Sequence, residues 1–193
     1  MQQQLLVVLL FSSSFLFAQV GIGTSTPNSE LEIKAPGSLP SLELNPQIAP
    51  LGTAMGQISV IGDELYLYDN NRLKWLTIST ANFNFGLEGN ISNRTLEYAG
   101  DITASGPRMP KNGTIVYLTL NSSGGNPTKG ATLDVVSSAG VTTSYNFQYV
   151  GGSRIYTQSN INVSAGDQLF FKINTDGASI QNPTVVLWIK WRK

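Results

Sequence analysis

From position 81 onward, the sequence is a series of short stretches in which apolar and polar residues alternate, separated by clusters of Gly, Asn, Pro and Ser. This alternation is typical of β-strands, and no stretch has the 3.6-residue spacing of an amphipathic helix. A set of short, closely spaced strands favours an all-β jelly-roll sandwich over an up-and-down barrel, although it leaves the connectivity open. Eight strands are predicted: Phe83 to Leu87, Leu96 to Ile102, Thr114 to Asn121, Ala131 to Ser137, Ser144 to Tyr149, Ser153 to Gln158, Gln168 to Asn174 and Thr184 to Trp191.

Three of these strands, the third, seventh and eighth, are apolar on both faces. Their second faces carry Ile115 and Tyr117, then Phe170, then Val186 and Trp188. A strand with one face in the core normally presents polar residues on the other face, as the fourth predicted strand does. We therefore predict that the three strands share one sheet and that these five side chains lie in a subunit interface. The alternative is a sugar-stacking platform made by the aromatic members of the set.

The composition excludes several kinds of chemistry. The chain has no His and no Cys, which removes Ser-His-Asp catalysis, cysteine nucleophiles, disulfides and the usual zinc ligands. Twelve basic and twelve acidic residues give a net charge of zero, and this disfavours nucleic acid and anionic membrane surfaces as partners. The sequence therefore predicts a protein that is not an enzyme.

The first eighteen residues predict a secretory signal peptide. An apolar run from Leu5 to Phe11 is followed by three serines and by a second apolar stretch that ends at Ala18, with cleavage expected there or nearby. The apolar run is shorter than the ~20 residues of a membrane span, which disfavours the alternative of an uncleaved anchor. We expect a secreted or cell-surface protein without a membrane span after cleavage.

Residues 19–55 form a Pro/Gly-rich segment that predicts an extended stalk or linker. It contains Val20-Gly21-Ile22-Gly23-Thr24, then Pro27 and Leu31-Glu32-Ile33. This pattern resembles an element of secreted, tail-fibre-like proteins of Bacteroidota and of phage fibres. The resemblance implies a stalk built from several chains, and a flexible linker is the alternative.

Residues 56–80 predict a small β-meander. Turns are expected at Gly62-Asp63 and at Asp69-Asn70-Asn71, with apolar residues alternating between them. A three-stranded ribbon of this size is marginally stable alone. We therefore expect the meander to pack against copies of itself or against the domain that follows it.

The last part, residues 81–193, carries a second resemblance. Gly113 to Leu118, then Val163 to Phe171 with its Ala-Gly-Asp turn, then Val185 to Ile189 are similar to strands of the C1q and tumour-necrosis-factor-like jelly rolls. The resemblance implies a homotrimer around a three-fold axis, with the doubly apolar strands on its inner sheet. The segment 19–55 would take the place of a collagen stalk.

Ligand recognition is expected in the loops of such a sandwich, with a cell-surface glycan or protein as partner. The alternatives are a monomeric carbohydrate-binding sandwich and a purely structural subunit of an extracellular fibre or appendage. The candidate binding residues are polar or aromatic and lie in or beside the longer loops. They are Asn121, Asn126, Lys129, Tyr149, Arg154 and Tyr156.

The carboxylates predict structural roles. Asp167 follows a Gly at the entry to the seventh strand, where an Asp side chain caps a turn by accepting backbone N–H bonds. Glu88, Glu97 and Asp101 have no spacing that would define a catalytic pair. Loop oxygens could bind calcium, but no D-x-D-x-D-G run supports this. The sequence thus assigns no catalytic residue, metal site or cofactor.

Overall fold

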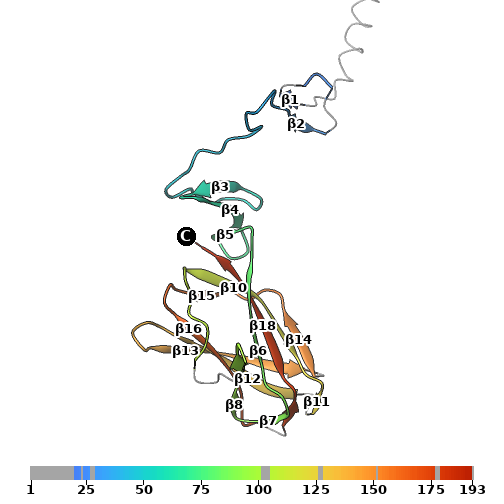
Figure 1. Ribbon diagram of the computed structural model, residues 1–193, viewed down its shortest axis with the longest axis vertical. Helices are drawn as coiled ribbons and strands as arrows, with labels where there is room; N and C mark the ends of the chain where they lie inside the picture. Colours follow the sequence, from blue (N-terminus) through green and yellow to red (C-terminus); the bar gives the residue numbers. More distant parts are fainter. Residues whose placement is uncertain are drawn as a thin grey trace, which may run out of the picture. The chain divides into compact units, whose positions relative to one another are not determined.

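The computed structural model describes residues 20–22, 24–26, 29–100, 105–125, 128–150, 152–176 and 179–192 (Figure 1). The predicted signal peptide, residues 1–18, lies outside this described part. The chain divides into two compact units, Met1–Asn45 and Pro46–Lys193. Every regular element among the described residues is a β-strand, which agrees with the predicted all-β class.

The first unit contains one small parallel pair. Strand β1 (Val20–Ile22) pairs with β2 (Leu31–Ile33), so that the two halves of the stalk motif lie side by side. Three residue pairs bury little surface, and Val20, Ile22 and Leu31 stay more than half exposed. The predicted extended segment continues beyond β2 without a further strand in this unit.

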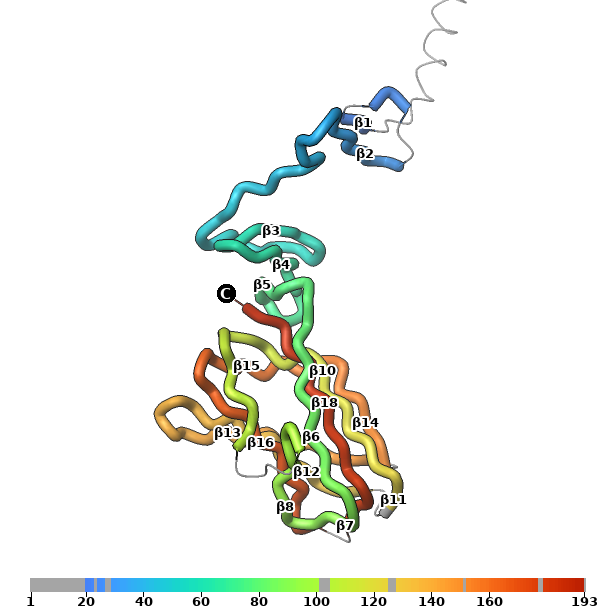
Figure 2. The backbone as a smooth tube through the Cα atoms, in the orientation of Figure 1, coloured from blue at the N-terminus to red at the C-terminus, as the bar shows by residue number. Residues whose placement is uncertain are grey.

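In the second unit, eight strands form the two sheets of a sandwich, which we name by their central strands. The β18 sheet has the order β14-β10-β18-β6, and the β16 sheet has the order β8-β16-β12-β13. All pairings within them are antiparallel, and β18 runs between β6 and β10 (Figure 2). The β18 sheet comprises β14 (Ser153–Tyr156), β10 (Gly113–Asn121), β18 (Thr184–Trp191) and β6 (Ala81–Gly86). The β16 sheet comprises β8 (Arg94–Thr95), β16 (Gln168–Ile173), β12 (Thr128–Val136) and β13 (Thr142–Val150).

The chain crosses from one sheet to the other at every connection between these eight strands except the hairpin from β12 to β13. This crossing order is that of a jelly roll, and the predicted fold is confirmed. Five shorter strands extend the edges. They are β9 (Glu97–Tyr98) beside β6, β15 (Ile161–Val163) beside β10, and a small sheet of β11 (Gly124–Gly125), β17 (Ile180–Gln181) and β7 (Asn90–Ile91).

The core lies between the two sheets and is made by alternate residues of each strand. Leu118 pairs with Leu187 in the β18 sheet, and Leu133 pairs with Phe171 in the β16 sheet, and all four are fully buried. Burying a large aliphatic or aromatic side chain stabilises a fold by about 1.5–3 kcal/mol. The alternating pattern of the sequence therefore predicts directly which side chains form this core.

The prediction that the three doubly apolar strands share one sheet is wrong. Strand β16 pairs with β12, whereas β10 and β18 pair with each other. Phe170 consequently lies on the outer face of the β16 sheet, opposite Asp134 and half-buried. The pattern of a strand gives its two faces but does not specify its neighbours, and this is why the grouping failed.

Ile115 was also placed wrongly, because it belongs to the core. It is fully buried and pairs with Ile189. The register of β10 against β18 shifts between Ile115 and Tyr117, which is the position of a β-bulge. A bulge adds one residue and reverses the faces on its two sides, so strict alternation assigns Ile115 to the wrong face.

The second predicted strand, Leu96 to Ile102, is shorter than expected. Strand β9 ends at Tyr98, and Ala99 and Gly100 follow with positive φ angles of 57° and 71°. Two successive residues in the left-handed region turn the chain out of the sheet. Residues 101–104 lie outside the described part of the chain.

The meander forms as predicted from β3 (Ile58–Ile61), β4 (Glu64–Asp69) and β5 (Lys74–Thr77). It packs against the jelly roll, since Leu76 forms a bridge with Arg192 at the end of β18. The Trp191 N–H also donates to Thr77 Oγ1 at 3.0 Å. The alternative partner, a copy of the meander, stays a prediction.

Arg72 fixes the meander to the sandwich. Its Nη1 lies 2.6 Å from Asp69 Oδ2, its Nε donates to the Ser159 carbonyl at 2.8 Å, and its Nη2 donates to the Val116 carbonyl at 2.9 Å. The side chain is 11% exposed. Because the guanidinium is mostly buried and hydrogen-bonded, each of these contacts contributes more to folding stability than a surface ion pair does.

We predict that Arg72→Met lowers the free energy of unfolding by about 3 kcal/mol, because Asp69 loses its partner and the carbonyls of Val116, Thr157 and Ser159 lose a donor. Urea denaturation followed by tryptophan fluorescence measures this change. The matched control is Arg94→Met at an exposed position of β8, which should change stability by less than about 0.5 kcal/mol. Equal stability of the wild type and Arg72→Met would contradict the assignment.

The same pair predicts a loss of stability in acid. Burial raises the pKa of Asp69, but the hydrogen bonds and charge of Arg72 outweigh it, and the pKa stays below its ordinary value of 3.8. A lowered folded-state pKa stabilises the protein above the unfolded-state pKa, and this contribution is lost as the pH falls through the folded-state value. We expect Asp69→Asn to lose less stability than the wild type between pH 6 and pH 3, measured by urea denaturation. An identical fall in both proteins would show that Asp69 does not contribute.

Candidate functional site

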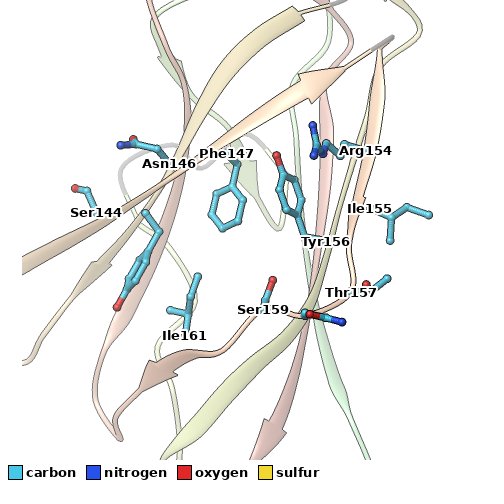
Figure 3. A pocket seen from close by; sticks show the side chains of 11 residues that line it. Ser144, Asn146, Phe147, Arg154, Ile155, Tyr156, Thr157, Ser159 and Ile161 are labelled. Carbon is cyan, nitrogen blue, oxygen red and sulfur yellow. The ribbon is translucent and has the colours of Figure 1, made fainter. Parts of the chain in front are cut away.

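The candidate site is a cleft at the open edge of the sandwich. Strands β13 and β14 are joined by a single residue pair, Val150 with Ser153, and then diverge into different sheets. The cleft between them has a volume of about 670 Å³ and is lined from both strands and from the segment that leads to β15 (Figure 3). This volume is within the range of small-ligand pockets.

Two aromatic rings form the inner wall of the cleft. Phe147 of β13 and Tyr156 of β14 meet edge to face, with ring centroids 5.0 Å apart and an interplanar angle of 78°. Phe147 also stacks on Phe171 of the core at 6.2 Å. Because both rings point inward from opposite sheets, the cleft opens directly onto the hydrophobic core.

The Tyr156 hydroxyl holds its ring in place by bridging the two strands. It donates to the Gln148 carbonyl at 3.0 Å and accepts from the Gln148 N–H at 2.9 Å. These are backbone groups on the edge of β13 that faces away from β12. The hydroxyl thus occupies the hydrogen-bonding positions that a neighbouring strand would otherwise use.

Arg154 lies next to Tyr156 on the same face of β14. In the ladder with β10, Arg154 is opposite Leu120 and Tyr156 is opposite Leu118, two core residues, so both side chains point toward the interior of the sandwich. The Arg154 guanidinium carbon lies 5.2 Å from the Tyr156 ring centroid, in a cation–π contact. The residue is exposed because this edge of the sandwich is open.

The rest of the lining mixes apolar residues with uncharged polar residues. Tyr145, Ile155 and Ile161 supply aromatic and aliphatic surface, and Thr157, Gln158 and Ser159 supply hydroxyl and amide groups. The Ser144 and Asn146 side chains lie on the outer face of β13, where the Ser144 hydroxyl donates to Asp134 at 2.5 Å and Thr132 Oγ1 lies 3.1 Å from Asn146 Oδ1. A second hollow, of about 430 Å³, adjoins the cleft and shares its Arg154 side.

The structure brings together two of the predicted ligand-binding residues, Arg154 and Tyr156. Asn121 is exposed at the end of β10, opposite Ser153. Asn126 lies outside the described residues. The segment from Asn121 to Lys129 therefore contributes nothing to this cleft among the residues that the structure describes.

Lys129 and Tyr149 were predicted as ligand-binding residues, and both are fully buried instead. Lys129 Nζ donates to Ser92 Oγ at 3.1 Å and to the Asp176 carbonyl, which links β12 to two loops. The Tyr149 ring lies in the core, and burial raises the pKa of its hydroxyl. Strand β12 begins at Thr128, before its predicted start at Ala131, and this places Lys129 within the strand. Tyr149 lies within the predicted strand and alternates with Tyr145 and Phe147 on its inner face, so its side chain enters the core.

We predict that Lys129→Ala lowers the free energy of unfolding by about 3 kcal/mol, because it leaves a cavity at a fully buried position and removes the donor to Ser92 and to the Asp176 carbonyl. Thermal unfolding followed by circular dichroism measures the effect. A residue that contacts a ligand without a structural role would leave the unfolding temperature unchanged, and that result would reverse the assignment. Lys190→Ala, at a half-buried position of β18, is the control and should have a small effect.

The β13 side of the cleft, where Tyr145 and Phe147 point inward, was not predicted from the sequence. A signal was present, since aromatic residues occupy every second position of the predicted strand Ser144 to Tyr149. An aromatic row on an edge strand indicates an incompletely covered core. What the sequence could not give was the identity of the strand that β13 faces.

The remaining polar groups have structural roles. Asp167 caps its turn as predicted, because its Oδ2 accepts the Ser164 N–H at 2.7 Å. Across the described residues, no group of three or more acidic side chains is placed to hold a metal ion. The same residues include no helix long and apolar enough to cross a membrane.

A second surface lies on the outer face of the β18 sheet. Tyr117 is opposite Trp188, and Thr119 is opposite both Val186 and Ile155. Tyr117 is 42% exposed and Ile155 is 67% exposed, while Val186 and Trp188 are half-buried. We call these five residues the apolar face. On β6 it is bordered by Asn82 and Asn84, opposite Trp188 and Val186, so no charged residue interrupts it on that side.

Fold and cleft together define an all-β jelly-roll domain with an aromatic-walled cleft at its open edge. No family model and no curated protein matches the sequence. The structure is similar to the globular domain of zebrafish complement 1qA protein, with a TM-score of 0.34 and 12% sequence identity over 58% of this chain and 98% of that chain. The jelly-roll assignment itself depends on the strand order.

Proposed function

We propose that this chain is a secreted, non-enzymatic, homotrimeric binding module that recognises a surface glycan or protein. The observation that carries the proposal is the apolar face of the β18 sheet. Monomeric proteins rarely leave contiguous aromatic and aliphatic side chains exposed unless a partner covers them.

The composition of the apolar face matches that of a subunit interface. Interface centres are enriched in Tyr and Trp and depleted of charged residues, and all five members of the face are uncharged. The outer face of the β16 sheet differs, since Asp134 and Lys172 lie there beside Phe170. This asymmetry favours association through one sheet only. A count of three subunits comes from the resemblance to C1q-like jelly rolls.

The stalk supports association independently. Large aliphatic side chains recur along the segment without burial, and an extended segment that buries so little cannot stabilise itself. Copies of the chain wound together would cover them, as in the fibre stalks that this segment resembles. The exposed residues are Leu39, Leu42, Leu44, Ile48 and Leu51.

In this proposal, recognition occurs at the cleft between β13 and β14. Ligand pockets combine apolar and aromatic walls with a few convergent polar groups, as Phe147, Tyr156 and Ser159 provide here. The signal-like segment 1–18 supports export to the surface where such a ligand would be met.

We predict that Val186→Glu converts the trimer to a monomer, because it places a charge at the centre of the buried interface. Multi-angle light scattering of the full-length secreted chain measures the change from three times the monomer mass to one. Phe170→Glu is the matched control, since it makes the same kind of change on the outer face of the other sheet and should leave the trimer intact. Circular dichroism checks that both variants are folded. A wild-type chain that is monomeric at micromolar concentration would overturn the proposal.

A further inference from the structure

We infer that the cleft binds an acidic saccharide, a sugar chain that carries carboxylates, and that Arg154 is the residue that pairs with a carboxylate. This inference rests on the proposed binding function and adds the chemical class of the ligand. It is carried by the position of Arg154, by the charge of the lining and by the chemistry of the surrounding groups.

Arg154 carries its charge on the inner face of a strand of the sandwich. It projects from the inner face of β14, in line with Leu120 of the core, where an apolar side chain would be expected. None of the residues that the structure describes offers its guanidinium a carboxylate within ion-pair distance, whereas Arg72 has Asp69. The guanidinium of Arg154 is therefore free to pair with an external anion, and its planar fork of donors matches a carboxylate.

The guanidinium is also held in position. Its contact with the Tyr156 ring restricts it, and that ring is fixed in turn by two hydrogen bonds to the Gln148 backbone. A guanidinium that is ordered before binding loses less entropy when it forms a two-pronged contact with a carboxylate. Figure 3 shows Arg154 and Tyr156 projecting from β14 toward Phe147 on the opposite strand.

The cleft has no negative charge of its own. Its eleven lining residues include Arg154 but no Asp or Glu. Asp134, which accepts the Ser144 hydroxyl, lies on the outer face of the β16 sheet. The site therefore attracts an anion at the Arg154 end and is neutral over the rest of its length.

The uncharged part of the lining favours a sugar over a peptide strand. Hydroxyl and amide groups around aromatic rings match the alternating hydroxyls and apolar faces of a saccharide. A peptide would add to the free edge of β13, but the Tyr156 hydroxyl already bonds both backbone groups of Gln148 there. An added strand would have to displace that hydroxyl before it could pair.

The test is isothermal titration of the full-length trimer with three probes. Tetragalacturonate carries four carboxylates on sugars, its methyl ester is the same oligosaccharide without charge, and tetraglutamate blocked at both ends carries four carboxylates on a peptide. We expect tetragalacturonate to bind about tenfold or more tightly than either of the others, since a charge-assisted hydrogen bond is lost in one and the sugar in the other. Binding should weaken with added salt.

Two variants locate the site. Arg154→Gln should reduce tetragalacturonate affinity by about tenfold or more without changing the weak affinity for the ester. Arg154→Lys should retain part of the affinity. The control, Arg94→Gln, removes the same charge from an exposed position of β8 outside the cleft and should bind as the wild type does.

Three results would overturn the inference: no binding of tetragalacturonate, equal binding of its ester or of tetraglutamate, or unchanged binding by Arg154→Gln. Light scattering on the same samples separates these failures from failure of the proposed assembly. A trimer that binds no probe would leave self-association standing and remove the acidic-sugar assignment. A monomer that binds tetragalacturonate through Arg154 would support the acidic-sugar assignment and overturn the proposed self-association.

Discussion

The cleft exists because β13 and β14 cannot remain paired. One residue pair joins them, after which β13 continues with β12 in one sheet and β14 with β10 in the other. An ordinary hairpin would have paired the two strands along their length and closed the edge of the sandwich. The divergence instead leaves the inner faces of both sheets open to solvent at this edge. Phe147, Tyr156 and Arg154 are functional candidates for this reason alone, since elsewhere in the sandwich the same inward positions are core.

Alternation along single strands was enough to predict the fold class, the core and the meander. The burial of Leu118, Leu133 and Leu187 was predicted by the two-residue alternation of apolar and polar side chains. The errors came from relations between strands. Phe170 was assigned to the wrong sheet because pairing is set by topology, and Ile115 to the wrong face because one bulge reverses the alternation. Lys129 is an error of another kind, since a buried lysine is stabilised by partners from distant loops that no local pattern reveals.

The candidate site was only half predictable for the same reason. Arg154 and Tyr156 stood out as polar aromatic or charged residues near a turn, and the structure places them together. Their partners on β13 were hidden, because the sequence does not state that the two halves of a hairpin belong to different sheets. A cleft made by one loop can be predicted from the residues of that loop. A cleft between two sheets depends on how the strands are connected, and local sequence does not specify this.

Strand β14 links the two proposed activities. Ile155 points outward to the apolar face, while Arg154 and Tyr156 point inward to the cleft, because successive residues of a strand face opposite sides. The strand is short and pairs along its length only with β10, while one residue pair and the Tyr156 hydroxyl link it to β13. Burial of Ile155 in a subunit interface would restrain the backbone that carries the two binding residues. Assembly and recognition would then be thermodynamically coupled, and each would strengthen the other by the same factor.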